Sequence, residues 1–269
     1  MSTAKTAGMI GLGAMGMPMA RHMADKGFTV VGFDVDAGTV KKAEGFKIRG
    51  VKTAAEVGKG TDVVVIMVAT DKQVREVIGG GLLDTLAEGS VICIASSTSP
   101  ETCAEMEALA AKKGIGVLDT PVVLGQKACD EGVMTVYVGG EKKWFDRAQP
   151  ALQCFGKEVL HLGKIGHGQI AKTMNNLLLW AIICANQEVL TLGKSLGADI
   201  PKMIEAMGKG SGANSSISRW GESTGKWAEK DLDVALDIAQ KAKVPMPLSG
   251  LVDQLVKGIN QEKMRSVLK

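Results

Sequence analysis

The first half of the chain alternates short apolar runs with longer amphipathic stretches, a pattern that predicts strands alternating with helices. Runs such as Val63–Val68 are continuously apolar, which is typical of strands buried on both faces of a parallel sheet. The order of the elements therefore predicts an α/β fold with a doubly wound sheet. The predicted strands are Ala7–Gly11, Phe28–Asp34, Asp62–Val68, Ser90–Ala95, Ile115–Asp119, Met134–Gly139 and Glu158–Leu162. The predicted helices are Met15–Lys26, Lys72–Ile78, Pro100–Lys113 and Lys142–Phe155.

The strand pattern stops after Leu162, and only helical patterns follow. We therefore predict two domains: residues 1–163 form a dinucleotide-type α/β domain, and residues 164–269 form an all-helical domain. A polar loop and a VPMP breaker separate helices in this second part. Its predicted helices are Gln169–Leu196, Pro201–Met207, Lys230–Lys241 and Leu248–Gly258.

Composition, net charge and the length of the apolar runs exclude some classes of protein and of binding partner. Of the 269 residues, 45% are hydrophobic and 23% charged, which is ordinary for a globular protein. The net charge is only +3 and the basic residues are scattered, so we expect no nucleic-acid partner. The longest apolar run in the middle of the chain, Leu177–Ala185, is too short to cross a bilayer, so we expect no membrane association.

The cysteine pattern and the N-terminal sequence indicate whether the protein binds a metal and in which cellular compartment it works. Five cysteines occur without a C-x-x-C pair, so we expect neither a zinc site nor a disulfide framework, and we predict no bound metal. Reduced thiols and the absence of a signal-peptide pattern predict a cytoplasmic protein.

A glycine-rich segment follows the first predicted strand and opens a helix. It has the G-x-G-x-x-G spacing, and its residues are Gly11, Leu12, Gly13, Ala14, Met15 and Gly16. In this context the three glycines allow a tight turn, a close approach of the backbone to a pyrophosphate, and close packing of helix on sheet. An ordinary βα turn is the alternative, and the strand–turn–helix context favours dinucleotide binding.

Asp34 ends the second predicted strand, 18 residues after Gly16, the approximate spacing of an acid that binds ribose hydroxyls. Asp36 follows closely, and a carboxylate repels the 2′-phosphate of NADP. We therefore predict NAD as the cofactor and NADP as the less favoured one. Lys41 and Lys42, a little further on, are the residues that weigh toward NADP.

The helix that begins near Gln169 carries Lys172, Asn175 and Asn176 on one face, because positions i, i+3 and i+4 are neighbours on a helix. Near a buried region, the pKa of a lysine falls toward neutrality, and the amine then becomes a usable acid or base. Asparagine amides hold hydroxyl or carboxylate groups. On helix physics alone, a solvated first turn is the simpler interpretation.

Four segments in order resemble the β-hydroxyacid dehydrogenase family, which includes 3-hydroxyisobutyrate dehydrogenase and semialdehyde reductases. They are GLGAMGMPMA at the start, DTPVVLG…EGVMTVYVGG at 119–140, GHGQIAKTMNN at 166–176 and KDLDVAL at 230–236. The resemblance implies a Rossmann domain, a helical C-terminal domain and a site in the cleft between them. It also implies hydride transfer between a nicotinamide cofactor and a small β- or ω-hydroxy acid or the matching semialdehyde, in a homodimer or homotetramer.

The resemblance also assigns roles to residues. Lys172 is the implied catalytic acid/base: it accepts the hydroxyl proton in oxidation and donates to the carbonyl oxygen in reduction. Asn176 is implied to bind the substrate, with Asn175 beside it, and Lys230 and Asp231 to lie near the nicotinamide and the substrate. Ser96 and Ser97 are expected beside the nicotinamide ring, and Met67 and Val68 at the adenosine side.

The chain departs from the family in two places. The family's D-x-P-V-S-G-G segment, which grips the substrate carboxylate, has Val123 and Leu124 in place of the serine and the first glycine. Backbone N–H groups of Val123, Leu124 and Gly125 remain the predicted substrate-binding groups, with Gln126 and Lys127 as possible side-chain contacts. The second departure is that residues 211–230 are shorter than in relatives, which bears on the placement of Lys230.

Three alternatives remain on the sequence alone. A 6-phosphogluconate dehydrogenase has a far longer helical domain than the one available here. An imine or keto reductase that acts on an atypical substrate is the second alternative, and imine reductases share the fold but usually lack the lysine. A catalytically inactive NAD-binding scaffold would also lose the lysine, so Lys172 favours an enzyme over both.

Overall fold

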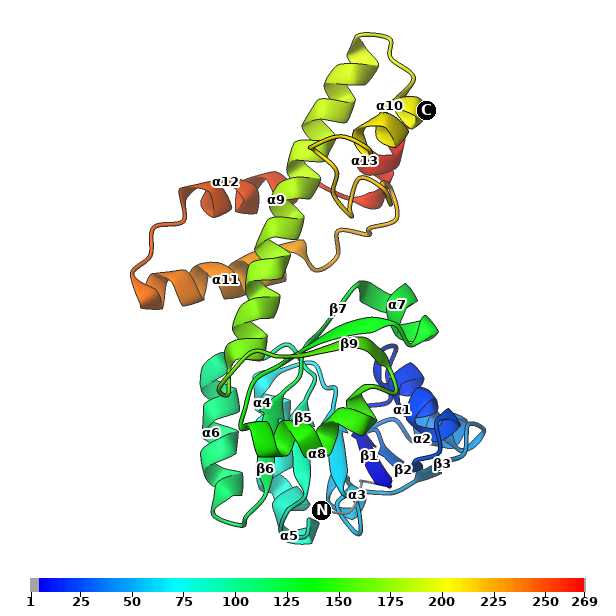
Figure 1. The fold of residues 1–269 in the computed structure, drawn as a ribbon, viewed down its shortest axis with the longest axis vertical. Coiled ribbons are helices and arrows are strands. Elements are labelled where there is room, and N and C mark those ends of the chain that lie inside the picture. The colour runs from blue at the N-terminus through cyan, green and yellow to red at the C-terminus, as the bar shows by residue number, and fades with distance from the viewer. Residues whose placement is uncertain (1–4, 269) are drawn as a thin grey trace. The chain divides into compact units, whose positions relative to one another are not determined.

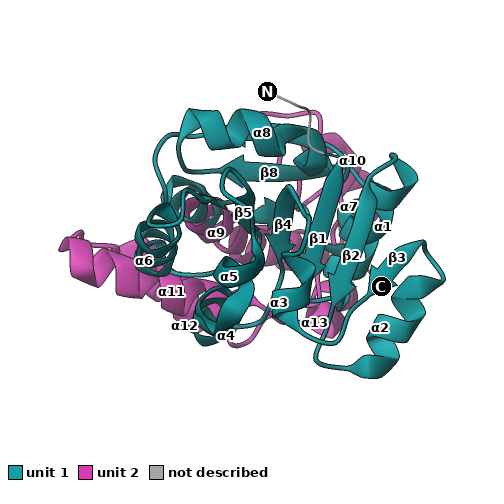
Figure 2. Cartoon of the chain, turned by 90° about the horizontal axis from the view of Figure 1, so that it is seen from below, with its two compact units in different colours: residues 1–172 teal, residues 173–269 magenta. Residues whose placement is uncertain are grey.

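The computed structural model describes residues 5–268, and the chain divides into two compact units (Figure 2). Unit 1 comprises residues 1–172 and unit 2 residues 173–269. The division falls inside helix α9 (His167–Ser195), later in the chain than the predicted boundary at 163/164.

Unit 1 is built on a parallel six-stranded sheet with the order β3-β2-β1-β4-β5-β6 (Figure 1). This is the order of a doubly wound, dinucleotide-binding sheet, which confirms the predicted fold class. Since the strands are parallel, their carboxyl ends all lie at one edge of the sheet, called the carboxyl edge below. The strands are β1 (Thr6–Ile10), β2 (Thr29–Phe33), β3 (Ile48–Gly50), β4 (Val63–Ile66), β5 (Val91–Ile94) and β6 (Gly116–Asp119).

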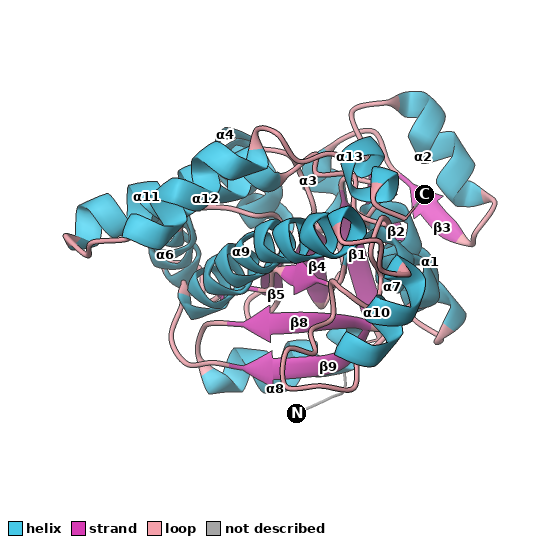
Figure 3. Ribbon diagram, turned by 90° about the horizontal axis from the view of Figure 1, so that it is seen from above, coloured by secondary structure: helices cyan, strands magenta, loops and turns pink. Residues whose placement is uncertain are grey.

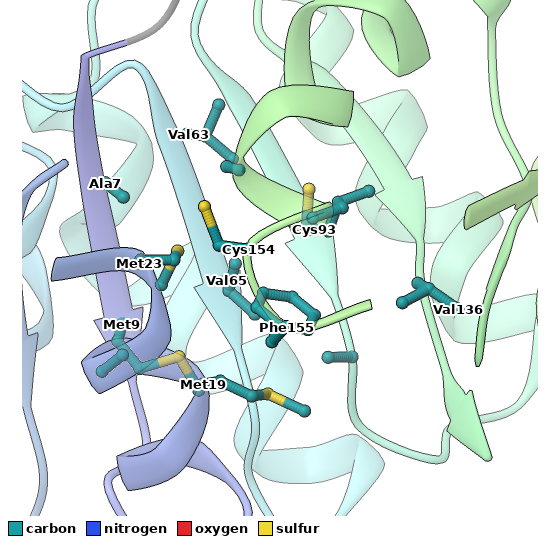
Figure 4. Close-up of a cluster of buried hydrophobic side chains, with 14 of the residues drawn as sticks. Ala7, Met9, Met19, Met23, Val63, Val65, Cys93, Val136, Cys154 and Phe155 are labelled. Carbon is teal, nitrogen blue, oxygen red and sulfur yellow. The ribbon is translucent and has the colours of Figure 1, made fainter. Parts of the chain in front are cut away.

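Helices cover both faces of this sheet, because successive strand residues point to opposite sides. Met9 packs with Met19 and Phe155 in one buried cluster (Figure 4), and its neighbour Ile10 packs in another with Val74 and Met106. The continuously apolar strand sequences follow from this two-sided burial. The helices of unit 1 before α9 are α1 (Gly16–Asp25), α2 (Ala37–Glu44), α3 (Ala54–Val57), α4 (Asp71–Val77), the π-helical turn η1 (Ile78–Leu82), α5 (Leu83–Thr85), α6 (Pro100–Ala111), α7 (Gly125–Glu131) and α8 (Lys142–Leu152).

A second, three-stranded sheet completes unit 1, with the order β7-β8-β9, and Figure 3 shows β8 and β9 side by side. Its strands are β7 (Val122–Val123), β8 (Met134–Val138) and β9 (Gly156–His161). The pair β7–β8 is antiparallel and the pair β8–β9 is parallel. An isolated antiparallel bridge between Asp119 and Gly139 joins the end of β6 to the residue after β8.

Unit 2 is helical in the described residues, which confirms the predicted character of the C-terminal part. After α9 come α10 (Ile200–Met207), α11 (Ala228–Ala242), α12 (Pro247–Val256) and α13 (Gln261–Ser266). By length and apolar content alone, α9 matches a membrane span. Its Trp180, Ile183 and Leu190 are instead buried in the hydrophobic core of unit 2, where α9 serves as the central helix.

Candidate active site

The glycine-rich turn between β1 and α1 is shaped partly by the protein's own packing. Gly11 has φ +89°, and a Cβ at this position would lie 2.1 Å from the Met67 carbonyl oxygen. A Cβ at Gly16 would lie 1.9 Å from the Gly11 carbonyl oxygen. Neither contact is possible for a real side chain, so these two glycines are required for the turn and for the packing of α1.

Gly13 differs from the other two glycines. Its φ is not in the left-handed region, and no neighbouring part of residues 5–268 lies within 4 Å of a Cβ built there. The space in front of Gly13 is therefore open, at the N-terminal end of α1 where backbone N–H groups attract anions. A pyrophosphate that approaches the backbone at this point explains why the residue has no side chain.

Asp34, directly after β2, holds this turn in place. Its Oδ2 accepts a hydrogen bond from the Leu12 N–H at 2.7 Å, and its Oδ1 accepts one from the Asp36 N–H at 3.0 Å. A carboxylate has about four lone-pair positions, so both oxygens retain capacity to accept from ribose hydroxyls. The residues thus fit a dinucleotide at both the phosphate and the ribose positions.

A second carboxylate lies beside the first. Asp36 is the N-cap of α2, and hydrogen bonds from the Thr39 hydroxyl and from the Gly38 and Thr39 N–H groups hold its pKa below the ordinary 3.8. Asp36 is therefore ionised at neutral pH. Two adjacent carboxylates at the end of β2 repel a 2′-phosphate, as predicted from the sequence.

Met67 and Val68 lie where the sequence placed the adenosine side, just beyond β4. The Met67 N–H donates to the Ile10 carbonyl at 2.8 Å, so the residue lies beside the glycine turn. The Val68 N–H donates to Ser96 Oγ at 2.7 Å. Ser96 is buried and its hydroxyl ties the ends of β4 and β5 together, whereas Ser97 is exposed at the same edge. Ser97 is thus the serine of this pair that presents its hydroxyl outward.

The predicted catalytic amine lies at this edge within unit 1. Lys172 Nζ donates to Ser97 Oγ at 2.6 Å, so the first turns of α9 reach the residues that follow β5. The Lys172 side chain is partly buried, in agreement with an amine that is aimed at a particular place rather than solvated on a helix surface. The contact places the amine at the carboxyl edge, and the catalytic role of Lys172 stays a prediction.

Asp119, which the sequence analysis did not single out as a site residue, fixes the start of α9. It is 0% exposed at the end of β6, and its two oxygens accept from the Gly166 and Gln169 N–H groups, each at 2.7 Å. Burial raises the pKa of Asp119, and the backbone hydrogen bonds oppose that rise. The carboxylate satisfies N–H groups that the helix itself leaves unpaired, and so orients the turn that carries Lys172.

Two glycines make room for this carboxylate. A Cβ at Gly168 would lie 2.7 Å from Asp119 Oδ2, and a Cβ at Gly139 would lie 2.3 Å from Oδ1. Gln169 adds a second link, since its Nε2 donates to the Ser96 carbonyl at 2.7 Å. The glycines of the GHGQ segment therefore serve the anchoring of α9.

The predicted substrate segment after β6 lies next to the glycine turn. Gln126 Nε2 donates to the Ala14 carbonyl at 2.7 Å and to Asp130 Oδ1 at 2.8 Å, and α7 lies against α1. Both amide N–H groups of Gln126 thus bind the protein, and a side-chain contact from Gln126 to the substrate stays a prediction. Val123 is buried in β7, while Leu124 is half-exposed with its backbone in the left-handed region, φ +84°.

In unit 2, the remaining predicted residues make contacts of their own. Asn175 Nδ2 donates to Asn176 Oδ1 at 3.0 Å. Lys230 Nζ lies 5.9 Å from the centre of the Trp227 ring. Asp231 accepts from Trp180 Nε1 at 2.9 Å and so ties α11 to α9. The substrate and cofactor roles of Asn175, Asn176 and Lys230 stay predictions.

Residues 5–268 contain no group of three or more His, Cys, Asp or Glu side chains that could hold a metal ion. Three groups lie at the carboxyl edge: the glycine turn, which suits an anion, the Asp34 carboxylate, which suits a ribose, and the primary amine of Lys172. Together these suit a nicotinamide cofactor and proton transfer to or from a substrate oxygen.

Comparison with known protein families gives matches over most of the chain. Residues 6–163 match the NAD binding domain of 6-phosphogluconate dehydrogenase, and residues 166–266 match the NAD-binding domain of NADP-dependent 3-hydroxyisobutyrate dehydrogenase. The first match covers more than half of the chain, and the two lie in the order that the resemblance implied.

Individual proteins agree with these family matches. The chain is 32% identical to 2-(hydroxymethyl)glutarate dehydrogenase of Eubacterium barkeri, over 97% of this chain and 93% of that protein. It is 28% identical to an NAD-dependent L-serine dehydrogenase of Pseudomonas aeruginosa, over 92% and 89% of the two chains. Among solved structures, 3-hydroxyisobutyrate dehydrogenase of Mycobacterium tuberculosis with L-serine has a TM-score of 0.87 at 25% identity, with 96% and 94% covered.

Proposed function

This chain belongs to the β-hydroxyacid dehydrogenase family, and from that premise we propose how its residues carry out hydride transfer on a small hydroxy acid. The chain is an NAD-dependent oxidoreductase that acts on the CH–OH group of a small β- or ω-hydroxy acid or on the matching semialdehyde. The observation that carries the mechanism is the hydrogen bond of 2.6 Å from Lys172 Nζ to Ser97 Oγ, at the carboxyl edge of the nucleotide-binding sheet.

The residues that would hold NAD follow the edge of the sheet. Residues 11–16 would bind the pyrophosphate, Asp34 the ribose, Met67 and Val68 the adenosine side, and Ser97 the nicotinamide end. When bound, NAD supplies the acceptor or donor of hydride at its nicotinamide ring. The chain contributes the position of the reactants and the movement of one proton.

Lys172 moves that proton. In oxidation, the neutral amine accepts the proton of the substrate hydroxyl as hydride leaves the same carbon; in reduction, the ammonium donates a proton to the carbonyl oxygen. Ser97 fixes where the amine lies by accepting one of its N–H bonds, and Asp119 fixes the helix turn that carries it. Proton transfer requires this alignment, because a general acid or base acts only within hydrogen-bonding reach.

The proposed function is tested by a panel of 3-hydroxyisobutyrate, L-serine, 2-(hydroxymethyl)glutarate and succinic semialdehyde, each with NAD or NADP in the oxidation state that the reaction needs. We expect cofactor absorbance to change with at least one acid, and kcat/KM to be about tenfold or more higher with NAD, because Asp34 and Asp36 oppose a 2′-phosphate. Higher kcat/KM with NADP would show that this role of Asp34 is wrong. Absence of turnover with every compound would favour the inactive-scaffold alternative.

We also propose that the chain works as a homodimer or homotetramer in the cytoplasm. The support for assembly is a stripe of apolar residues that are 59–77% exposed: Met174, Leu178 and Leu192 on the unit 2 part of α9, and Leu196 directly after it. Such a stripe usually marks an interface. Support for the location comes from the five cysteines, all buried and unpaired, which suit a reducing compartment.

Assembly is measured by light scattering on a size-exclusion column. We expect the wild type to elute as a dimer or tetramer, and a double variant with Leu192→Glu and Leu196→Glu to elute as a smaller species, because buried unpaired carboxylates disrupt an apolar interface. Lys209→Glu changes the charge at an exposed position away from the stripe and should leave the mass unchanged. A monomeric wild type at micromolar concentration contradicts the proposal.

A further inference from the structure

Gln169 binds the backbone on both sides of Ser97. Its Oε1 accepts a hydrogen bond from the Thr98 N–H at 3.3 Å, and its Nε2 donates to the Ser96 carbonyl at 2.7 Å. These two groups belong to the peptide units immediately before and after the Cα atom of Ser97, and the φ and ψ angles of Ser97 are rotations of those two units. One side chain therefore restricts both backbone angles of the serine, and with them the direction of its hydroxyl group.

The amide of Gln169 fits its partners in one orientation. A glutamine amide has an acceptor end and a donor end, and here the acceptor meets an N–H group and the donor meets a carbonyl. Gln169 is 2% exposed, and Ser96 and Thr98 are 1% and 6% exposed, so water competes little for either bond. The exposed Ser97 side chain is therefore carried by a backbone segment that is hydrogen-bonded inside the protein.

The helix that carries Gln169 also carries the amine that contacts Ser97. Gln169 and Lys172 are at positions i and i+3 of α9, which are neighbours on one helix face, and both belong to unit 1. Lys172 Nζ donates to the Ser97 hydroxyl at 2.6 Å, while Gln169 binds the backbone on either side of it. The Gln169 N–H also donates to Asp119 Oδ2, so this residue connects the anchored start of α9 to the serine.

We propose that Gln169 is a positioning residue for proton transfer, which keeps Ser97 Oγ within hydrogen-bonding distance of Lys172 Nζ. The inference rests on the proposed function and adds to it a residue that acts through Ser97 rather than on the substrate or the cofactor. Because Gln169 is almost fully buried, substrate and NAD bind to other groups. Its loss should therefore lower kcat, which depends on the alignment of the amine, and change KM and NAD affinity little.

A double-mutant cycle of Gln169→Ala with Ser97→Ala tests whether the glutamine acts through the serine. We expect kcat to fall by about tenfold in each single variant and by no more than about twentyfold in the double variant, whereas independent effects would multiply to about a hundredfold. KM and the NAD affinity of Gln169→Ala should stay within about threefold of wild type. Gln169→Met keeps the length of the side chain without the amide, and it replaces the alanine variant in the cycle if that variant does not fold.

Ser90→Ala is the control for loss of a buried hydrogen bond. Ser90 is buried just before β5, at the opposite end of the strand from Ser97, and its Oγ donates to the Thr61 carbonyl at 3.1 Å. Ser90→Ala and Gln169→Ala each remove a buried hydrogen bond to a backbone group, so both should lower the melting temperature. Only Gln169→Ala should lower kcat, measured well below both melting temperatures.

Gln169→Glu tests the orientation of the two hydrogen bonds by their response to pH. An ionised carboxylate accepts at both ends, so one oxygen would repel the Ser96 carbonyl, whereas the protonated acid donates there and restores both bonds. Burial favours the protonated acid, because it raises the pKa of a carboxyl group. In semialdehyde reduction, where the Lys172 ammonium is the proton donor, the ratio of kcat for Gln169→Glu to kcat for Gln169→Ala should rise several-fold from about pH 8 to about pH 6.

The ratio of the two variants removes the titration of the neighbouring groups. Asp119, which accepts from the backbone N–H of Gln169, and Lys172, one helical turn further on, are present in both variants. The Cys103 thiol, which contacts Thr98 Oγ1, stays neutral over this range because burial raises its pKa to about 12.

The outcomes separate the positioning role from the proposed function. Wild-type kcat in Gln169→Ala or Gln169→Met overturns the positioning role and leaves the proposed function intact. Multiplied losses in the double variant, an equal loss of kcat in Ser90→Ala, or a ratio that does not change with pH overturns it as well. Absence of turnover of every panel compound by the wild type overturns the proposed function, and this inference with it.

Discussion

Replacement of Lys172 by alanine should lower kcat by about 10²–10⁴-fold while NAD still binds with nearly the wild-type affinity. The amine lies 2.6 Å from Ser97 Oγ, and the methyl group of alanine can neither accept nor donate a proton in its place. The residues assigned to the phosphates and the ribose lie elsewhere along the edge, so the nucleotide keeps its contacts. Steady-state kinetics measure kcat, and calorimetric titration with NAD measures the affinity.

Controls for this result come from the same part of the chain. Lys164→Ala removes an exposed lysine shortly before α9 and should leave kcat unchanged. Ser97→Ala keeps the amine but removes the group that positions it, so we expect a loss of kcat of about tenfold, between wild type and Lys172→Ala, together with an altered pH dependence of kcat. Wild-type kcat in Lys172→Ala would refute the assignment of the amine.

Replacement of Gly13 by valine should weaken NAD binding by about 10–100-fold or more without lowering the melting temperature. The new side chain meets no neighbouring part of residues 5–268 within 4 Å of its Cβ, so the folded chain tolerates it. It does fill the space in which the pyrophosphate approaches the backbone. Differential scanning calorimetry measures the melting temperature, and titration with NAD measures the affinity.

Two other glycine substitutions serve as controls for this prediction. Gly16→Ala should lower the melting temperature, since its Cβ would overlap the Gly11 carbonyl at 1.9 Å. Gly212→Val adds the same side chain as Gly13→Val at another open position, in unit 2, and should alter neither stability nor NAD affinity. If Gly13→Val binds NAD as the wild type does, the turn does not hold the pyrophosphate.

Most of the fold was predictable because its strands and long helices carry strong local signals. The buried strands read as continuous apolar runs, and α9 and α11 read as long helical patterns. Short elements escaped, since three or fewer residues, as in β3 and β7, are too few to show a period. The same holds for α7, whose seven residues include a glycine at the start.

The site was predictable where chemistry and spacing coincide in one segment. The glycines, Asp34 and Lys172 each belong to a local motif, and the structure brings them to the same edge of the sheet. Asp119 was missed because its partners Gly166 and Gln169 lie 47 and 50 residues away, and no local pattern states which helix a carboxylate will cap. The left-handed backbone of Leu124 was equally hidden, since leucine rarely adopts it.

The carboxylate that starts α9 also constrains how this sequence can change over time. Asp119, Gly139 and Gly168 come from three separate parts of the chain, yet any atom added to one of them occupies space taken by another. Lengthening the acid to glutamate meets the same lack of room as adding a methyl group to either glycine. A larger side chain at any one of these three positions therefore requires a compensating change at another, or the helix start that orients the amine is lost.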